Sequence, residues 1–138
     1  MLKRGCSKCE KLKKEGYFWQ NKSVAAYFSR PDFKGHCTIV LKNHKEKITD
    51  MTAKESHDLM DALIKVGKAI EKTIKPDIIN YQMNMNWVKH VHCHIYPRFK
   101  KDDDSWGEPI KIPGKNAKFK KRELSEKEKE KIISLVKK

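Results

Sequence analysis

The feature that most constrains the fold is the run KHVHCHIYPRF, residues 89–99, in which His90, His92 and His94 stand at every second position. Successive side chains of a β-strand point to opposite faces, so a strand here places all three imidazoles on one face. The residues between them are apolar, as a face packed on a core requires. A solvated histidine-rich strand is the alternative, but the apolar register favours a strand with one face buried and the other available for chemistry.

The chain is short and strongly basic. Its 138 residues fit a single domain, 1–138, with a basic C-terminal extension at about 111–138. The 32 Lys and Arg residues against 18 Asp and Glu give a formal charge of +14, which indicates an anionic partner, although a solvated lysine coat explains much of it. The sequence has no 18-residue apolar segment and no apolar run of signal-peptide length near its start, so we expect a cytoplasmic protein without membrane contact.

Strand patterns fall in two pairs. Residues 23–28 and 36–41 flank the turn sequence RPDFKG and are predicted to form an antiparallel hairpin. Later in the chain, DIINYQ is predicted as a third strand, followed by a polar connection and then the histidine strand. These strands predict an α+β fold whose sheet is mostly antiparallel.

Helix signals follow each strand pair. Thr52 and Glu55 have capping-box spacing, and Pro76 ends the long helix that they begin. The helix carries an apolar stripe of Leu59, Leu63, Val66, Ile70 and Ile74. Ser125 and Glu128 repeat the capping-box spacing, so a short C-terminal helix is predicted after them.

The four cysteines are expected to be free thiols or metal ligands, because the predicted compartment is reducing. Cys37 and Cys93 lie in apolar strand patterns and are predicted as small core residues. Cys6 and Cys9 have the CxxC spacing that suits tetrahedral zinc, which needs two more ligands. The histidines that could supply them are His36, His44, His57 and the alternating three.

The alternating histidines do not suit a single metal ion. On a strand, neighbouring histidines of this set are about 6.6 Å apart, and the outer two histidines are about 13 Å apart. Either a His-x-His pair binds a metal, or the middle imidazole attacks an electrophile while its neighbours serve other positions. Neutral histidine is a nucleophile near pH 7. Because the chain is basic and has no Ser or Cys nucleophile motif, the expected electrophile is phosphorus.

The sequence HVHCHIY resembles the signature of the histidine triad (HIT) family. Further segments follow the order and spacing of that family's small cytosolic members over roughly residues 6–110, namely CSKCE, GHCTIVLKNH, ITDMT, KPDIIN, HVHCHIYPRF and DDDSWGEPI. The resemblance implies a HIT-like antiparallel sheet of about five strands with one long helix and a short C-terminal helix. It also implies a nucleotide hydrolase or transferase that acts at an α-phosphate, usually as a homodimer.

The same resemblance implies roles for individual residues. His92 would be the nucleophile that forms a nucleotidyl-histidine intermediate, and His94 and Asn86 would contact phosphate oxygens. His36 matches a substrate-side position that is histidine in some branches and aromatic in others. In family members with the cysteine pair, zinc is held by the equivalents of Cys6, Cys9, His44 and His90. A metal-free CxxC with His44 capping a turn is the alternative.

The sequence also departs from the family pattern. Asn84, Met85 and Asn86 stand where related members have Leu-Gly-Asn, and Trp87 follows where smaller residues are usual. The ribose-contacting Asp of many members has no clear counterpart near Phe28. The sequence therefore does not determine which base and which leaving group the substrate carries.

Three functions are compatible with these patterns. The leading one is hydrolysis of a nucleotide conjugate, such as a dinucleoside polyphosphate or a nucleoside phosphoramidate. The second is a nucleic-acid-binding module, or a hydrolase of nucleotide adducts at DNA ends, that uses the basic segment 115–122. The third is a zinc-stabilised, non-catalytic scaffold.

Overall fold

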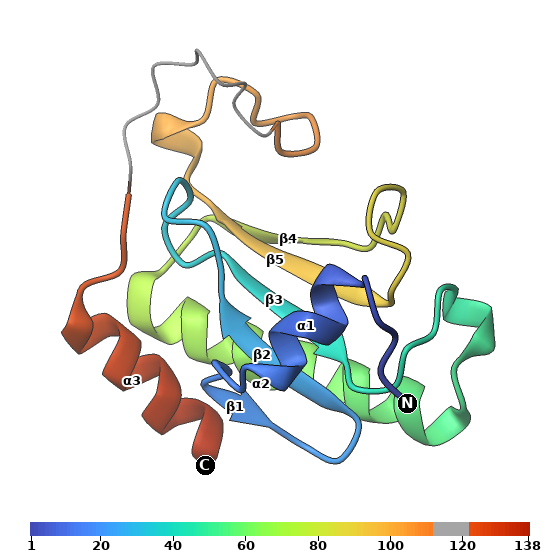
Figure 1. Ribbon diagram of the computed structural model, residues 1–138. Helices are drawn as coiled ribbons and strands as arrows, with labels where there is room; N and C mark the ends of the chain where they lie inside the picture. The colour runs from blue at the N-terminus through green and yellow to red at the C-terminus, as the bar shows by residue number, and fades with distance from the viewer. Residues whose placement is uncertain (112–121) are drawn as a thin grey trace.

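The computed structural model describes residues 1–111 and 122–138 and shows an α+β fold around one antiparallel sheet (Figure 1). The sheet has five strands in the order β1-β2-β3-β5-β4. The strands are β1 (Trp19–Gln20), β2 (Val24–Phe28), β3 (Cys37–Leu41), β4 (Ile78–Gln82) and β5 (His92–Arg98). The described residues also form the helices α1 (Ser7–Lys13), α2 (Ala53–Ile74) and α3 (Glu126–Lys137), and the short 3-10 helices Ile48–Asp50 and Lys100–Asp102. The predicted fold class is confirmed.

The long helix α2 begins and ends as predicted. The Thr52 hydroxyl accepts a hydrogen bond from the Glu55 N–H, and the Glu55 carboxylate accepts one from the Thr52 N–H. At the other end Lys75 adopts a left-handed conformation just before Pro76. Four residues of the predicted stripe are buried, namely Leu59, Leu63, Val66 and Ile70. They pack against one face of the sheet, which supplies most of the helix's stability.

The C-terminal helix α3 is part of the same core. Ser125 and Glu128 form the second predicted capping box. Ile132 and Val136 are buried in the cluster that also contains residues of α2, and Figure 1 shows the two helices side by side. Residues 115–121 of the predicted basic segment lie outside the described residues. Of the helices that the structure describes, none combines the length and the hydrophobicity that crossing a bilayer requires.

The alternating strand has the two faces that its sequence predicts. Cys93 and Ile95 are buried in the core beneath the sheet, whereas the histidines lie on the opposite face. That second face is partly covered by α1 and the segment after it, because Leu12 of α1 and the later Tyr17 pack on the buried residues Ala25, Tyr27 and Val40. The helical form of Ser7–Lys13 was not predicted, since so short a segment has no apolar stripe.

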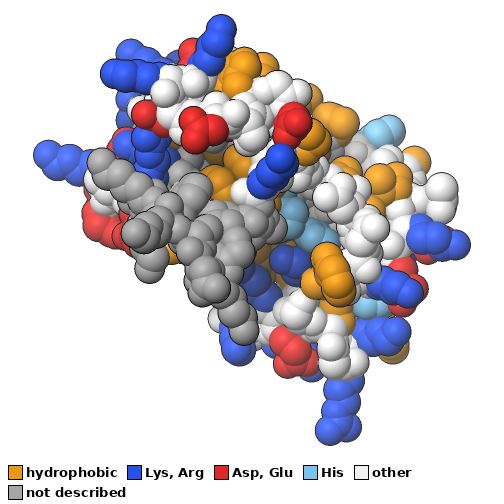
Figure 2. All heavy atoms as spheres, turned by 90° about the horizontal axis from the view of Figure 1, so that it is seen from above, with side chains coloured by type: hydrophobic (Ala, Val, Ile, Leu, Met, Phe, Trp, Pro, Cys, Tyr) orange, Lys and Arg blue, Asp and Glu red, His pale blue; other side chains and the backbone are white. Residues whose placement is uncertain are grey.

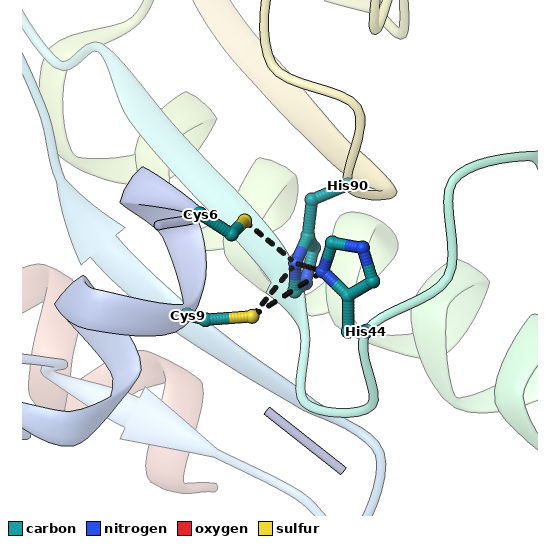
Figure 3. A group of neighbouring side chains, drawn as sticks. All are labelled: Cys6, Cys9, His44 and His90. Atoms are coloured by element: carbon teal, nitrogen blue, oxygen red, sulfur yellow. Dashed lines mark hydrogen bonds between the residues drawn. The ribbon is translucent and has the colours of Figure 1, made fainter. Parts of the chain in front are cut away.

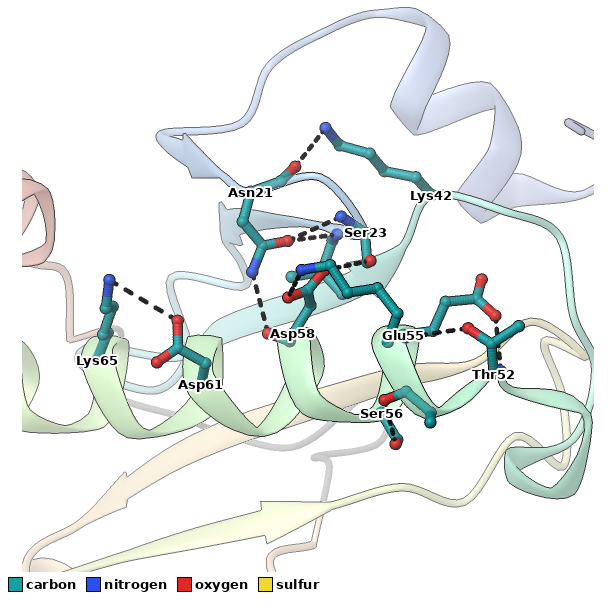
Figure 4. Close-up of polar contacts among 12 residues, drawn as sticks. Asn21, Ser23, Lys42, Thr52, Glu55, Ser56, Asp58, Asp61 and Lys65 are labelled. Atoms are coloured by element: carbon teal, nitrogen blue, oxygen red, sulfur yellow. Dashed lines mark hydrogen bonds and ion pairs between the residues drawn. The ribbon is translucent and has the colours of Figure 1, made fainter.

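A polar network ties the start of α2 to the loops beside it (Figure 4). The Asn21 side chain accepts hydrogen bonds from the backbone N–H groups of Ser23 and Val24 and donates one to the Asp58 carbonyl. The buried Glu55 carboxylate also accepts hydrogen bonds from Asn43 and Lys45. The network therefore anchors the loop that follows β3 to the first turn of the helix.

Candidate active site and metal centre

His92 lies at the centre of the histidine face. It pairs with Val40 across β3 and β5, and its side chain is buried. Its Nδ1–H donates a hydrogen bond to the His90 carbonyl at 2.5 Å, so Nε2 is the nitrogen that keeps the lone pair. Burial lowers the pKa of His92, although the hydrogen bond to the carbonyl opposes this effect. The ring is therefore neutral at pH 7, as a nucleophilic imidazole must be.

His94 and His36 form a second imidazole pair beside His92. His36 precedes β3, and its Nε2 lies 3.0 Å from Nδ1 of His94. The buried Nδ1 of His36 has no hydrogen-bond partner among the described residues. A buried N–H without a partner costs more than an unpaired lone pair, so His36 Nε2–H donates to His94 Nδ1. The proton of neutral His94 is then on Nε2, where it can be donated to a substrate oxygen.

Both members of this pair are neutral over a wide pH range. Burial, reinforced by the neighbouring imidazole and then by basic side chains, lowers the pKa of His36 to about 3 and that of His94 to about 4. Two hydroxyls extend the pair. Thr38 Oγ1 lies 3.3 Å from His94 Nδ1, and Ser29 Oγ lies 2.5 Å from Thr38 Oγ1. Sequence reasoning missed Thr38 and Ser29, and only the antiparallel pairing of Thr38 with His94 could have indicated them.

A separate cluster contains the four residues that the family resemblance assigns to zinc. The ligand atoms of Cys6, Cys9, His44 and His90 all lie within 4.8 Å of one another (Figure 3). Cys9 Sγ is 3.3 Å from His44 Nδ1 and 3.4 Å from His90 Nδ1, and the two Nδ1 atoms are 3.1 Å apart. A tetrahedron with zinc-ligand bonds of about 2.0 to 2.3 Å has edges of roughly 3.3 to 3.8 Å. The distances from Cys9 Sγ to the two imidazoles fall in this range, and Cys6 Sγ also lies 3.4 Å from His90 Nδ1, so these donors are spaced for a metal of that size.

The surroundings of the cluster also suit a metal. His90 Nε2–H donates to the Leu41 carbonyl at 2.6 Å, which leaves Nδ1 deprotonated and directed at the cluster. The Lys3 N–H donates to Cys9 Sγ at 3.2 Å, which favours a thiolate, but burial outweighs this hydrogen bond and raises the pKa of the Cys9 thiol. Two thiolates and two imidazoles are a typical zinc donor set.

Asn86 is the predicted site residue that the structure does not bring to the histidines. It is exposed in the loop between β4 and β5, and no hydrogen bond between its side chain and another described residue is present. The preceding Met85 has a φ of +51°, so this loop takes the conformation that favours glycine without having one. A role for Asn86 at phosphate stays a prediction.

Comparison with known families gives the class of protein. The family model described as "HIT domain" matches residues 12–101. The chain therefore belongs to the histidine triad family.

Curated relatives match over part of their length. The chain is 31% identical over 91 residues to "Bis(5'-nucleosyl)-tetraphosphatase [asymmetrical]" of Schizosaccharomyces pombe, covering 62% of this chain and 50% of that protein. It is 32% identical over 76 residues to "Protein hit" of Bacillus subtilis, covering 51% of this chain and 52% of that protein. The chain thus spans about half the length of the curated relatives it matches.

Solved structures share the fold over nearly the whole chain. A zinc-bound histidine triad family protein from Mycobacterium smegmatis has a TM-score of 0.71 at 17% identity, covering 96% of this chain and 94% of that one. A HIT family protein from Bacillus anthracis has a TM-score of 0.66 at 20% identity, covering 97% and 96%. At these identities the likeness establishes the fold alone.

Proposed function

We propose that this protein hydrolyses or transfers nucleotides by cleaving nucleotide conjugates at the α-phosphate through a nucleotidyl intermediate on His92. The observation that carries the proposal is the hydrogen bond from His92 Nδ1–H to the His90 carbonyl, because it leaves a neutral Nε2 as the nucleophile. The similarity to a fission yeast bis(5'-nucleosyl)-tetraphosphatase supports the nucleotide class. Dinucleoside polyphosphates and nucleoside phosphoramidates are the substrate types we favour.

The arrangement of imidazoles supports a two-step reaction. In the first step the Nε2 lone pair of His92 forms a bond to the α-phosphorus while the bond to the leaving group breaks. His94 Nε2–H stabilises the charge that develops on the phosphate or leaving-group oxygen. In the second step water attacks the phosphorus and releases a proton to solvent, the phosphorus–nitrogen bond breaks, and the nucleotide leaves neutral His92 behind. His36 holds His94 in the tautomer that this role requires.

We also propose that Cys6, Cys9, His44 and His90 hold a structural zinc ion. Their donor spacing and the zinc-bound relative from Mycobacterium smegmatis support the assignment. A four-ligand site is closed, so zinc there supplies cross-linking of three chain segments and no position for a reacting water. Within the chain, the cluster fixes α1 to the end of the sheet beside the catalytic histidines.

A homodimer is the assembly we favour. The edge strand β4 has no described strand partner on its outer side, and its Ile78 and Tyr81 are 51% and 45% exposed. Exposed apolar residues on an unpaired edge favour pairing with a second strand. Antiparallel pairing of two β4 strands around a two-fold axis would cover these residues in both copies.

The decisive experiment is detection of the covalent intermediate. Wild-type protein is mixed with diadenosine tetraphosphate or adenosine 5'-phosphoramidate, quenched rapidly and examined by intact-protein mass spectrometry. We expect an adenylyl adduct that maps to His92. His92→Asn should lack the adduct and lose turnover by several orders of magnitude, whereas His57→Asn changes an exposed histidine of α2 and should keep both.

Two results would redirect the assignment. Full turnover by His92→Asn would show that another group is the nucleophile. A zinc-loaded wild type that turns over no nucleotide of the panel would favour the scaffold function instead.

A further inference from the structure

The proposed reaction moves a proton in each of its two steps. A basic leaving group such as an amine must gain a proton in the first step, and the attacking water must lose one in the second. Burial lowers the pKa of His94 to about 4, so its ring is neutral near pH 7 and carries one N–H proton. A neutral ring that gives up this proton becomes an anion unless its other nitrogen is protonated at the same time. His94 Nδ1 therefore needs a proton donor.

Two groups lie beside His94 Nδ1. His36 Nε2 is 3.0 Å away, and Thr38 Oγ1 is 3.3 Å away. The route through His36 ends inside the protein, because its Nδ1 is buried and has no hydrogen-bond partner among the described residues. If His36 passed its proton to His94, no neighbour on the far side of the ring could replace it, and a buried imidazole anion would remain.

The route through the Thr38 hydroxyl continues toward the surface. Thr38 is almost completely buried on β3, directly opposite His94 of β5. Its Oγ1 lies 2.5 Å from Oγ of Ser29, which follows β2 and is partly exposed. All three residues line a pocket of about 420 Å³ on the histidine face, and Figure 2 shows that histidine atoms reach the surface of the molecule. A line of polar groups therefore leads from His94 Nδ1 to a position that water can reach.

The charged side chains of the pocket do not offer the same route. Among the described residues that line it, none is Asp or Glu, so no carboxylate there could hold the proton. Lys8 and Lys11 also line the pocket, but an ammonium group has no lone pair and can only donate. A hydroxyl has one O–H donor and two acceptor lone pairs, so it can pass a proton in either direction.

We propose that Thr38 and Ser29 form a proton relay between solvent and Nδ1 of His94, and that the relay reverses its direction between the two steps of the reaction. The inference rests on the proposed function and adds two positioning residues to it. Both hydroxyls act through His94, and neither needs to touch the substrate.

In the first step the proton on His94 Nε2 passes to the leaving group as the bond from that group to phosphorus breaks. The Thr38 hydroxyl proton passes to His94 Nδ1, the Ser29 hydroxyl proton passes to Thr38 Oγ1, and a water molecule restores the proton of Ser29. His94 is then neutral again with its proton on Nδ1, and one hydroxide ion is left in solvent.

In the second step every transfer runs the other way. Nε2 of His94 now has a lone pair and accepts a proton from the attacking water. The proton on Nδ1 returns through Thr38 and Ser29 to solvent, where it neutralises the hydroxide ion of the first step. The Nε2–H of His36 opposes a proton on Nδ1 of His94, so the original tautomer is the more stable one and is restored.

The choice of leaving group tests the relay. Adenosine 5'-phosphoramidate releases ammonia, which requires a proton, whereas the 4-nitrophenyl ester of AMP releases 4-nitrophenolate without one. The rate of the first step is measured as leaving-group release with protein in excess over substrate. Thr38→Val has a similar shape and no hydroxyl, and it should slow ammonia release by about 100-fold but nitrophenolate release by no more than about threefold. Thr38→Ser keeps the hydroxyl and should restore ammonia release to within about fivefold of wild type.

A solvent isotope effect gives a second readout that a change in packing would not alter. The wild-type rate of ammonia release should fall along a curve as the fraction of D₂O rises, because several protons move together, and Thr38→Val should give a straight line. Ser29→Ala should show the same selectivity for the leaving group as Thr38→Val. Thr73→Val is the matched control, because the Thr73 hydroxyl donates to the Ala69 carbonyl within α2, and both rates should stay unchanged.

The outcomes distinguish the relay from the proposed function. Equal slowing of both substrates by Thr38→Val, or a wild-type rate of ammonia release in that variant, would overturn the relay, while an adenylyl adduct on His92 would still support the proposed function. If wild type releases neither leaving group, the proposed function is refuted and the relay with it.

Discussion

Glu55 should contribute more to stability than its position on the first turn of a helix suggests. The side chain is only 7% exposed, and its carboxylate accepts hydrogen bonds from Lys45 Nζ at 2.5 Å, the Thr52 N–H at 2.9 Å and Asn43 Nδ2 at 3.2 Å. Burial alone would raise the pKa of this carboxyl group, but the three hydrogen bonds outweigh burial and hold the pKa at about 2 against an ordinary 4.5. The folded state therefore favours the ionised form.

The magnitude follows from the linkage between pKa and stability. A carboxyl pKa lowered by more than two pH units corresponds to about 3 kcal/mol of unfolding free energy. This contribution is fully present above the unfolded pKa of 4.5 and is lost as the pH falls through the folded pKa of about 2. In Glu55→Gln the amide oxygen still accepts the Thr52 N–H, so the loss at pH 7 should be about 2 to 3 kcal/mol. The difference from wild type should be roughly halved near pH 3.

Urea unfolding of wild type and Glu55→Gln at pH 7, 5, 4 and 3 measures the difference in their free energies of unfolding. Histidine protonation cancels from this difference because it affects both proteins alike. Glu128→Gln is the matched control, because Glu128 occupies the equivalent capping-box position of α3 but its side chain is 25% exposed and has one lysine partner at 3.0 Å. Its loss should stay below about 1 kcal/mol. Equal losses in the two variants, or a Glu55→Gln difference that is the same at pH 3 as at pH 7, would refute the reasoning.

Three further changes have defined outcomes. Gly35→Ala should lower the free energy of unfolding by about 2 to 4 kcal/mol, because φ is +82° and the new Cβ would lie 2.7 Å from Ile74 Cδ1. Gly5→Ala is the control, because its φ is +84° but the space around it is open, and it should cost about 1 kcal/mol in the same urea assay. Metal analysis should find about one zinc per chain in untagged protein and none in Cys6→Ser/Cys9→Ser, which should have a lower Tm than wild type. A wild type that contains no metal and is as stable as a zinc-loaded sample would contradict the zinc assignment. Ile78→Lys should shift sedimentation from dimer to monomer, and an unchanged sedimentation coefficient would exclude the β4 edge as the interface.

The parts of the fold that could be predicted from the sequence are those that depend on patterns of neighbouring residues. Alternation over five residues determines which side chains of β5 face the core, and Cys93 and Ile95 are buried as that period requires. Both capping boxes are also local, because a hydroxyl and a carboxylate three residues apart can satisfy each other's backbone partners wherever a helix begins. Such signals need no knowledge of the rest of the chain.

The parts that were not predicted depend on contacts between distant segments. Helix α1 has only seven residues, and its packing over Tyr27 is a tertiary contact that no periodic pattern in the sequence predicts. Strand β1 has two residues, too few for any strand pattern. The 3.0 Å contact of His36 with His94 joins residues 58 positions apart, and the Thr38 hydroxyl beside it depends on the register of β3 on β5. The CxxC spacing indicated half of the candidate metal cluster, while His44 and His90 entered through the family resemblance.

One residue joins the two sites of the molecule. The ring of His90 is fixed by its Nε2–H hydrogen bond to the Leu41 carbonyl, and Nδ1 points into the cysteine cluster. The backbone carbonyl of the same residue receives the Nδ1–H of His92 and so selects the tautomer of the proposed nucleophile. Disorder at His90 would therefore reach His92 through one hydrogen bond, although the His90 side chain itself is directed at the cysteines. Alternating histidines allow this link because their side chains lie on the same face of the strand and the backbone carbonyl of the first lies within hydrogen-bond distance of the second ring. The side chain of the first histidine can then hold a metal, while its backbone carbonyl orients the second histidine.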